Sequence, residues 1–154
     1  MLEGYVDIYL PDLKYKEARM SAAYSSAPDY FEAASQAVLE MYRQTGKAVY
    51  DEKGLIKKGL LIRHLVLPEG CLDSIAILEW INENLPVSEI LVSIMNQYTP
   101  VYRSAEFEKI NRPLTSHEYR KVTARAQKLG ICGYVQDAGT ERVEYIPPFD
   151  LQGV

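Results

Sequence analysis

The stretch GLLIRHLVLP, residues 59–68, decides the fold. It is rich in branched apolar side chains at successive positions and ends at a proline, so it predicts a strand with a sharp stop. Residues 74–85 follow with apolar side chains at helical spacing, and Pro86 ends that pattern. Residues 89–95 again have the composition of a strand. This β-α-β order predicts two parallel strands joined by a right-handed crossover.

The same alternation continues upstream. Residues 5–10 are rich in β-branched and aromatic side chains and stop at Pro11, which cannot donate to a sheet ladder, so they predict a strand. Apolar residues at helical spacing run from Pro28 to Gly46 and predict a helix. The lysine-rich stretch 54–59 lies between two glycines and leads into the decisive strand.

Downstream, the loop over residues 96–112 is predicted to hold one helical turn. Residues 115–118, TSHE, form a capping-box pattern that opens a helix ending near Gly130, and residues 133–136 predict a final strand. Residues 138–154 contain two prolines and two glycines with little periodicity, which predicts an extended tail.

Strands that alternate with helical segments place the chain in the α/β class. We interpret residues 1–137 as the C-terminal half of a partial, TIM-like (β/α) barrel with about four parallel strands and flanking helices, followed by the tail 138–154. Four strands are too few to close an eight-stranded barrel, so an open sheet is the alternative architecture. In both cases functional groups are expected at the carboxyl ends of the strands.

Composition excludes several classes of protein. The 154 residues carry a formal net charge of −4 with Lys and Arg scattered, so binding to nucleic acid or anionic lipid is not expected. The longest apolar stretch is interrupted by Arg63 and His64 and is too short to span a membrane. Cys71 and Cys132 lack CxxC spacing, which argues against a disulfide framework, a zinc site or a complete iron–sulfur site. A cytoplasmic location is therefore expected.

Asp12 and Lys14 follow the first predicted strand. Two residues that lie two positions apart in an extended segment point to the same side, so this pair can present opposite charges to a zwitterionic ligand or hold a cation. A local ion pair without function is an equally good interpretation of the same pattern.

Arg63 and His64 are neighbours in the decisive strand, so they face opposite sides of the sheet. For His64 we favour a core histidine bonded to backbone over a metal ligand, because His117 lies on another element without ligand spacing. Gln97 and Tyr98 follow the third strand and can donate hydrogen bonds to a ligand, although a polar turn and a packing tyrosine explain them equally well.

Several motifs, in this order, resemble one protein family. VDIYLPDLKY at residues 6–15, GLLIRHLVLPEG at 59–70 and SIMNQYTP at 93–100 are similar to successive strand motifs of radical S-adenosylmethionine proteins of the pyruvate formate-lyase-activating enzyme type. EMYRQTG at 40–46 and RPLTSHEYRKV at 112–122 extend the resemblance over most of the chain.

The resemblance implies a set of cofactor-binding residues. The family's Asp-Leu-Lys motif corresponds to Asp12 and Lys14, which implies Asp12 near a bound cation and Lys14 near the methionyl carboxylate of S-adenosylmethionine. The strand motif implies cofactor contacts from Arg63 and Leu65, and Tyr98 stands where activating enzymes often have His. No catalytic residue and no metal ligand is assigned to this chain.

The family's reaction needs a [4Fe-4S] cluster held by a CxxxCxxC motif, which this sequence lacks. Because the family places that motif upstream of the Asp-Leu-Lys strand, we expect this chain to be the C-terminal portion of a truncated oxidoreductase. The intact parent would cleave S-adenosylmethionine reductively and act on a protein substrate such as a glycyl-radical enzyme. The portion alone is expected to be inactive and to hold neither cofactor.

The alternative function belongs to a different class. It is a stand-alone, non-catalytic α/β module that binds a partner chain, or a second copy of itself as a homodimer, through its exposed sheet edge.

Overall fold

The structure is a computed structural model that describes residues 3–135. The helices and strands, in chain order, are β1 (Ile8–Tyr9), α1 (Ala18–Ser25), α2 (Tyr30–Thr45), β2 (Val49–Tyr50), β3 (Ile56–Leu65), α3 (Cys71–Asn84), β4 (Leu91–Met95), the 3-10 helices η1 (Tyr102–Glu106) and η2 (Glu108–Ile110), α4 (Ser116–Lys128) and β5 (Gly133–Val135). The tail predicted over 138–154 lies outside the described residues.

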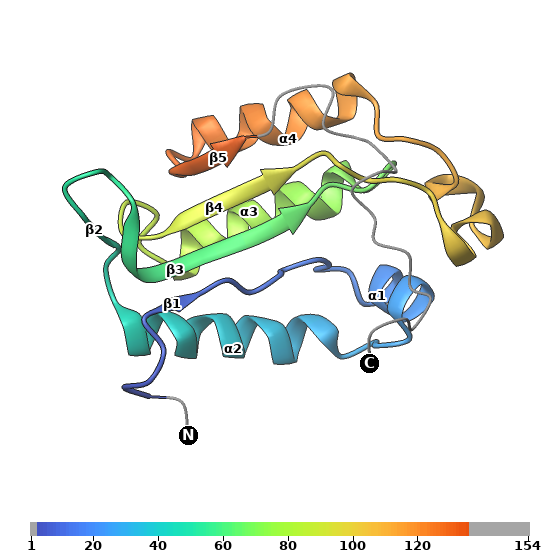
Figure 1. Cartoon of the computed structure of the whole chain (residues 1–154). Helices are drawn as coiled ribbons and strands as arrows, with labels where there is room; N and C mark the ends of the chain where they lie inside the picture. The colour runs from blue at the N-terminus through green and yellow to red at the C-terminus, as the bar shows by residue number, and fades with distance from the viewer. Residues whose placement is uncertain (1–2, 136–154) are drawn as a thin grey trace, which may run out of the picture.

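The sheet is mostly parallel, with the strand order β1-β3-β4-β5 (Figure 1). Each strand on this path lies beside the one that precedes it, and the order does not reverse. The short β2 pairs antiparallel with β3. The α/β class and the parallel sheet are confirmed, whereas closure into a barrel is not observed over residues 3–135. Strands β1 and β3 pair at Ile8↔Gly59 and Tyr9↔Leu60. Strands β3 and β4 pair from Leu61↔Leu91 to Leu65↔Met95, and strands β4 and β5 pair from Val92↔Gly133 to Ile94↔Val135.

The two faces of the sheet differ. In β3 the side chains of Leu60, Ile62 and His64 are fully buried in the core, which α2, α3 and α4 complete on that side. Figure 1 shows α3 behind β3 and β4, α2 along β1, and α4 along β5. Residues 61, 63 and 65 alternate to the opposite face, which we call the open face. It carries the apolar residues Leu61, Leu65, Leu91 and Met95 around Arg63.

Helix α4 begins where the sequence predicts it. The Thr115 hydroxyl accepts a hydrogen bond from the Glu118 amide, and the Glu118 carboxylate accepts one from the Thr115 amide, so the capping box is confirmed. Such a cap is worth about 1 kcal/mol. Among the helices of residues 3–135, none is long and apolar enough to cross a membrane.

Two predicted strands begin three or more residues away from the observed start. The first strand covers only Ile8–Tyr9, and Tyr5 lies in a turn with 87% of its surface exposed. The second begins at Ile56 rather than at Leu60, because β2 folds back and pairs with the lysine-rich stretch. The sequence analysis predicted neither β2 nor α1.

Gly59 is where β3 meets both β1 and the segment before β2. Its backbone φ is +138°, and a Cβ atom there would lie 2.9 Å from the Ala48 Cα atom. The contact is with backbone, so it cannot be relieved by rotating a side chain. The close approach therefore requires a residue without a Cβ atom.

Gly59→Ala is expected to lower the free energy of unfolding by at least about 2 kcal/mol, since it adds a backbone clash to strain at positive φ. Gly54→Ala, at φ +77° with no atom within 4 Å of the added Cβ, isolates the strain and is expected to cost about 1 kcal/mol. Urea denaturation measures both. Equal losses in the two variants would contradict the close approach.

Candidate functional site

Asp12 and Arg63 form the centre of the candidate site, where β1 and β3 end. Beyond Pro11 the chain pairs with β3 again: the Arg63 amide donates to the Pro11 carbonyl at 2.9 Å, and the Leu13 amide to the Arg63 carbonyl at 2.9 Å. This register brings the side chains together. Arg63 Nε and Nη2 each lie 2.7 Å from Asp12 Oδ1.

Lys14 completes a triad on the open face. Its Nζ atom lies 3.7 Å from Asp12 Oδ2, and the side chains of Asp12, Lys14 and Arg63 are 33%, 51% and 45% exposed. Ion pairs this exposed contribute little to stability, because water screens them. The three charges can therefore exchange partners with a ligand at small cost to the fold. The prediction that Asp12 and Lys14 point to the same side is confirmed.

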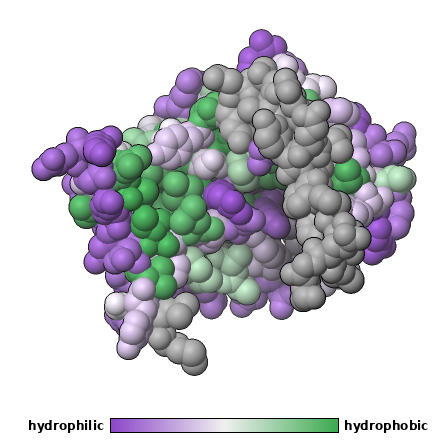
Figure 2. Space-filling model, viewed as in Figure 1, coloured by the Kyte–Doolittle hydropathy of each residue, from purple (hydrophilic) through white to green (hydrophobic). Residues whose placement is uncertain are grey.

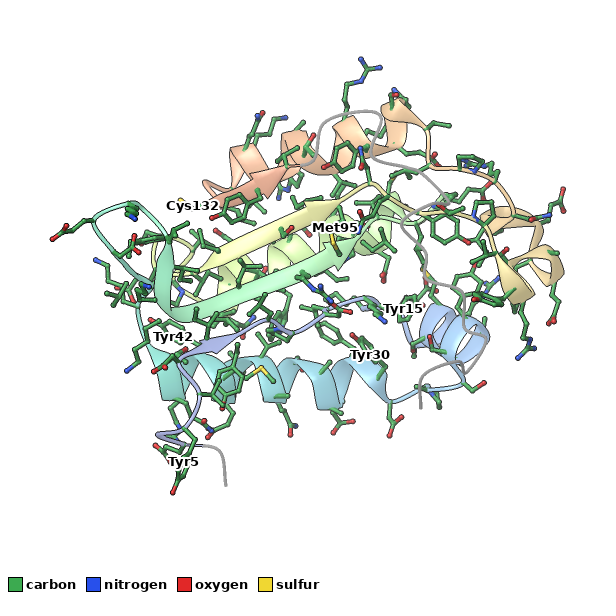
Figure 3. The ribbon with its side chains drawn as sticks, in the orientation of Figure 1. Tyr5, Tyr15, Tyr30, Tyr42, Met95 and Cys132 are labelled. Atoms are coloured by element: carbon green, nitrogen blue, oxygen red, sulfur yellow. The ribbon has the colours of Figure 1, made fainter. Side chains whose placement is uncertain are left out.

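Tyr30, from the start of α2, fixes the backbone that carries the triad. Its hydroxyl donates to the Asp12 carbonyl at 2.9 Å and accepts from the Lys14 amide at 2.9 Å. The ring packs edge-on against Tyr15 with 5.5 Å between centroids, and Figure 3 shows both rings beside this segment. Burial raises the pKa of Tyr30, so the hydroxyl keeps the proton that it donates.

His64 fixes the same segment from the core side. Its Nδ1 atom lies 2.8 Å from the Leu13 carbonyl oxygen, and its Nε2 atom lies 2.8 Å from Ser74 Oγ. A carbonyl can only accept, so Nδ1 carries the proton and Nε2 accepts from the serine hydroxyl. Burial lowers the pKa of His64, although the Leu13 hydrogen bond and the Asp73 charge oppose the shift. The predicted core histidine bonded to backbone is confirmed.

Asp73, in the first turn of α3, holds the far end of the segment. Its carboxylate accepts from the Lys16 amide at 3.1 Å and from the Glu17 amide at 2.6 Å. Glu17 is the residue before α1, so this buried carboxylate fixes where α1 begins. We call the contacts of Tyr30, His64 and Asp73 with residues 12–17 the three-point clamp. The sequence analysis assigned no role to Tyr30 or Asp73.

Leu65 and Tyr98 are placed differently from the triad. Leu65 lies two residues beyond Arg63 on the open face, in register with Met95, which Figure 3 labels at the end of β4. The Tyr98 hydroxyl donates to the Ile110 carbonyl at 2.8 Å, and burial raises its pKa. The structure therefore places Leu65 beside the triad, whereas the Tyr98 hydroxyl has a backbone partner of its own.

Glu118 ties together the loops at this end of the sheet. Its carboxylate binds the Arg112 guanidinium through two hydrogen bonds of 2.7 and 2.9 Å and accepts from the Glu69 amide at 2.7 Å. The hydrogen bonds from Arg112 hold the pKa of Glu118 well below its usual range. The capping-box glutamate thus also anchors the turn that follows β3.

Neither cysteine has the surroundings of a nucleophile. Cys71 is the first residue of α3, but burial and then the nearby Glu118 charge raise the pKa of its thiol, so the helix start gives no activated thiolate. Cys132 is a free, exposed thiol. Over residues 3–135, no three His, Cys, Asp or Glu side chains are grouped so that they could hold a metal ion.

Comparisons with known proteins give one relative and no function. No family profile matches the chain, and no solved structure matches it. The chain is 30% identical over 134 residues to the uncharacterized protein MJ0674 of Methanocaldococcus jannaschii. The match covers 85% of this chain and 34% of the relative, so the chain spans about a third of that protein's length.

His64 makes stability depend on pH. Because burial lowers its pKa in the folded state, the unfolded chain binds a proton first as the pH falls below about 6.5. The stabilisation is complete above that pH. It is lost by up to about 1.4 kcal/mol per pH unit as the pH falls toward the folded-state pKa.

Urea denaturation between pH 7 and pH 5 checks this dependence. His64→Leu should remove most of the slope. An unchanged slope in His64→Leu would refute the assignment.

Proposed function

We propose that this chain is the C-terminal, cofactor-binding portion of a radical S-adenosylmethionine enzyme of the pyruvate formate-lyase-activating type. The observation that carries the proposal is the triad of Asp12, Lys14 and Arg63 at the carboxyl ends of β1 and β3. The unreversed order β1-β3-β4-β5 supports it, because consecutive strands of a (β/α) barrel also lie side by side.

The residues present suit the polar end of S-adenosylmethionine. Lys14 and Arg63 offer cations to a methionyl carboxylate, and Asp12 offers a carboxylate to a cation beside it. Leu65 and Met95 add an apolar surface on the same face. When bound, S-adenosylmethionine supplies a sulfonium carbon–sulfur bond whose reductive cleavage begins hydrogen abstraction. The part of this chain is to bind and orient it, and the three-point clamp holds the binding groups in place.

The described residues do not suit a [4Fe-4S] cluster, because the two free cysteines are 61 positions apart in sequence and no metal-ligand group is formed. In the proposal the cluster ligands belong to a part of the enzyme outside this chain, and the chain alone is inactive. The greater length of the archaeal relative is compatible with such a part. A glycyl-radical protein as substrate belongs to the same proposal.

S-adenosylhomocysteine is the probe that tests this proposal, because it keeps the amino-acid end and cannot be cleaved reductively like a sulfonium. Added to the isotope-labelled chain, it is expected to shift the amide signals of residues 12–15 and 63–65. The dissociation constant should be about 1 mM, which is too weak for the chain alone to retain the cofactor. Lys14→Ala and Arg63→Ala should each weaken binding at least about fivefold through the loss of one charged contact.

Lys58→Ala is the matched control, since Lys58 is an exposed lysine at the other end of β3. It should bind the probe as the unchanged chain does. Absence of binding, or binding that survives both Lys14→Ala and Arg63→Ala, would contradict the proposed function.

A second proposal is that the chain is a non-catalytic module that pairs with a second copy of itself. The open face favours it. Leu61, Leu65 and Met95 are only partly buried there, no helix of residues 3–135 covers them, and Leu10 is 54% exposed beside β1. Figure 2 shows apolar residues gathered over the strands in this view, next to a polar patch. The edge strand β5 adds Tyr134 and Val135, each 55% exposed.

Sedimentation equilibrium separates this proposal from the first. A module is expected to sediment as a dimer, and Leu10→Glu should weaken the dimer at least about tenfold by placing a charge in its interface. Leu55→Glu, at a position 61% exposed between β2 and β3, is the control and should leave the dimer intact. A monodisperse monomer would rule the module out.

A further inference from the structure

A pocket of about 360 Å³ lies apart from the triad. Its walls come from α1, from the turn after β3 and from the 3-10 helices after β4, so it opens at the same end of the sheet as the candidate site. Neither Asp12, Lys14 nor Arg63 lines it. The proposed function does not use this pocket.

An aromatic pair forms one wall of the pocket. Tyr24 of α1 and Phe107 meet edge to face, with 5.1 Å between ring centroids and an interplanar angle of 85°. Both rings are half-buried, and Met20 and Pro68 continue the apolar wall. Half-buried aromatic rings in a concave site provide a large contact area and a negative ring face for a cation.

Carboxylates outnumber cations at the rim of this wall. Glu17, Glu69 and Glu108 face the pocket together with Arg19 and Lys109, which gives three negative charges against two positive ones. Lys109 is held by Glu69 at 3.9 Å. Burial, followed by Tyr15 and Glu69, raises the pKa of Tyr24, while Arg19 opposes the shift. The charged side chains that line the pocket therefore sum to one net negative charge.

The pocket is also built on a fixed frame. Glu17 is the last residue of the segment that the three-point clamp holds, and its amide donates to the Asp73 carboxylate. The Glu69 amide donates to the Glu118 carboxylate. Both rim residues are thus anchored through their backbone while their carboxylates remain exposed. A ligand that binds here meets groups that need little ordering.

We propose that this pocket binds a guanidinium or ammonium group carried on an apolar stem. The aromatic wall takes the stem and the cation, and the carboxylates of Glu17 and Glu108 neutralise the charge. An arginine or lysine side chain of an extended peptide has this chemistry, and so has a free alkyl amine. The inference does not depend on S-adenosylmethionine binding.

The test uses two probes and a neutral twin on the isotope-labelled full chain. The first probe is the peptide acetyl-Gly-Leu-Arg-Gly-amide, its twin has citrulline in place of arginine, and the second probe is agmatine. The arginine peptide is expected to shift the signals of Tyr24 and Phe107 and to bind at least about fivefold more tightly than the citrulline twin. Agmatine has the guanidinium and stem of arginine without a peptide backbone, so binding as tight as that of the peptide identifies a site for a free small-molecule cation, and weaker agmatine binding identifies a peptide site.

Matched variants make the proposal falsifiable. The double change Glu17→Gln and Glu108→Gln keeps shape and should weaken the arginine peptide at least about threefold, whereas Arg19→Ala should leave it unchanged or tighten it. S-adenosylhomocysteine binding at the triad should be the same in all of these variants, so failure of one proposal is distinguishable from failure of the other. Equal binding of the two peptides, or shifts confined to other residues, would overturn the inference.

Discussion

The buried His64 side chain is the contact on which the candidate site depends. It links β3, the backbone at Leu13 and helix α3 through two hydrogen bonds of 2.8 Å. A buried ring with both nitrogens satisfied is costly to disrupt, because each freed partner would remain buried without a hydrogen bond. Residues 12–17 belong to no helix or strand. Tyr30 and Asp73 nevertheless fix this segment, because each of them binds its backbone amides.

In this arrangement the residues that stabilise the fold are not the residues that can bind a ligand. Stability comes from the core face of β3, where Leu60, Ile62 and His64 are buried, whereas Asp12, Lys14 and Arg63 lie exposed on the opposite face. Alternation along β3 separates Arg63 from Leu60, Ile62 and His64, and the pairing of the segment beyond β1 with β3 places Asp12 and Lys14 on the same face as Arg63. The exposed charges can therefore bind and release a ligand without unfolding the segment that carries them. The same clamp places Glu17 at the rim of the pocket beside α1.

Sequence periodicity predicted the elements whose apolar pattern is strong, and it missed those defined by distant contacts. The β-α-β unit and the capping box at Thr115 follow from local patterns, and so does the opposite orientation of Arg63 and His64. Helix α1 has no such pattern, because its start depends on Asp73, a residue 56 positions away from Glu17. The clamp was unpredictable for the same reason. The proximity of Asp12 and Arg63 required the register of two strands, which the sequence alone does not specify.

Amide hydrogen exchange on the unmodified chain tests the hold on this segment most directly. The amide of Lys14 donates to Tyr30, the amides of Lys16 and Glu17 donate to Asp73, and the Leu13 amide donates to the Arg63 carbonyl beside His64. The account predicts that the amides of Leu13, Lys14, Lys16 and Glu17 exchange as slowly as amides of β3, although three of the six residues from 12 to 17 are solvent-exposed. Exchange of these amides within about tenfold of the rate of an unstructured peptide would contradict it. The segment would then be a mobile loop, and the triad could not be a preorganised binding site.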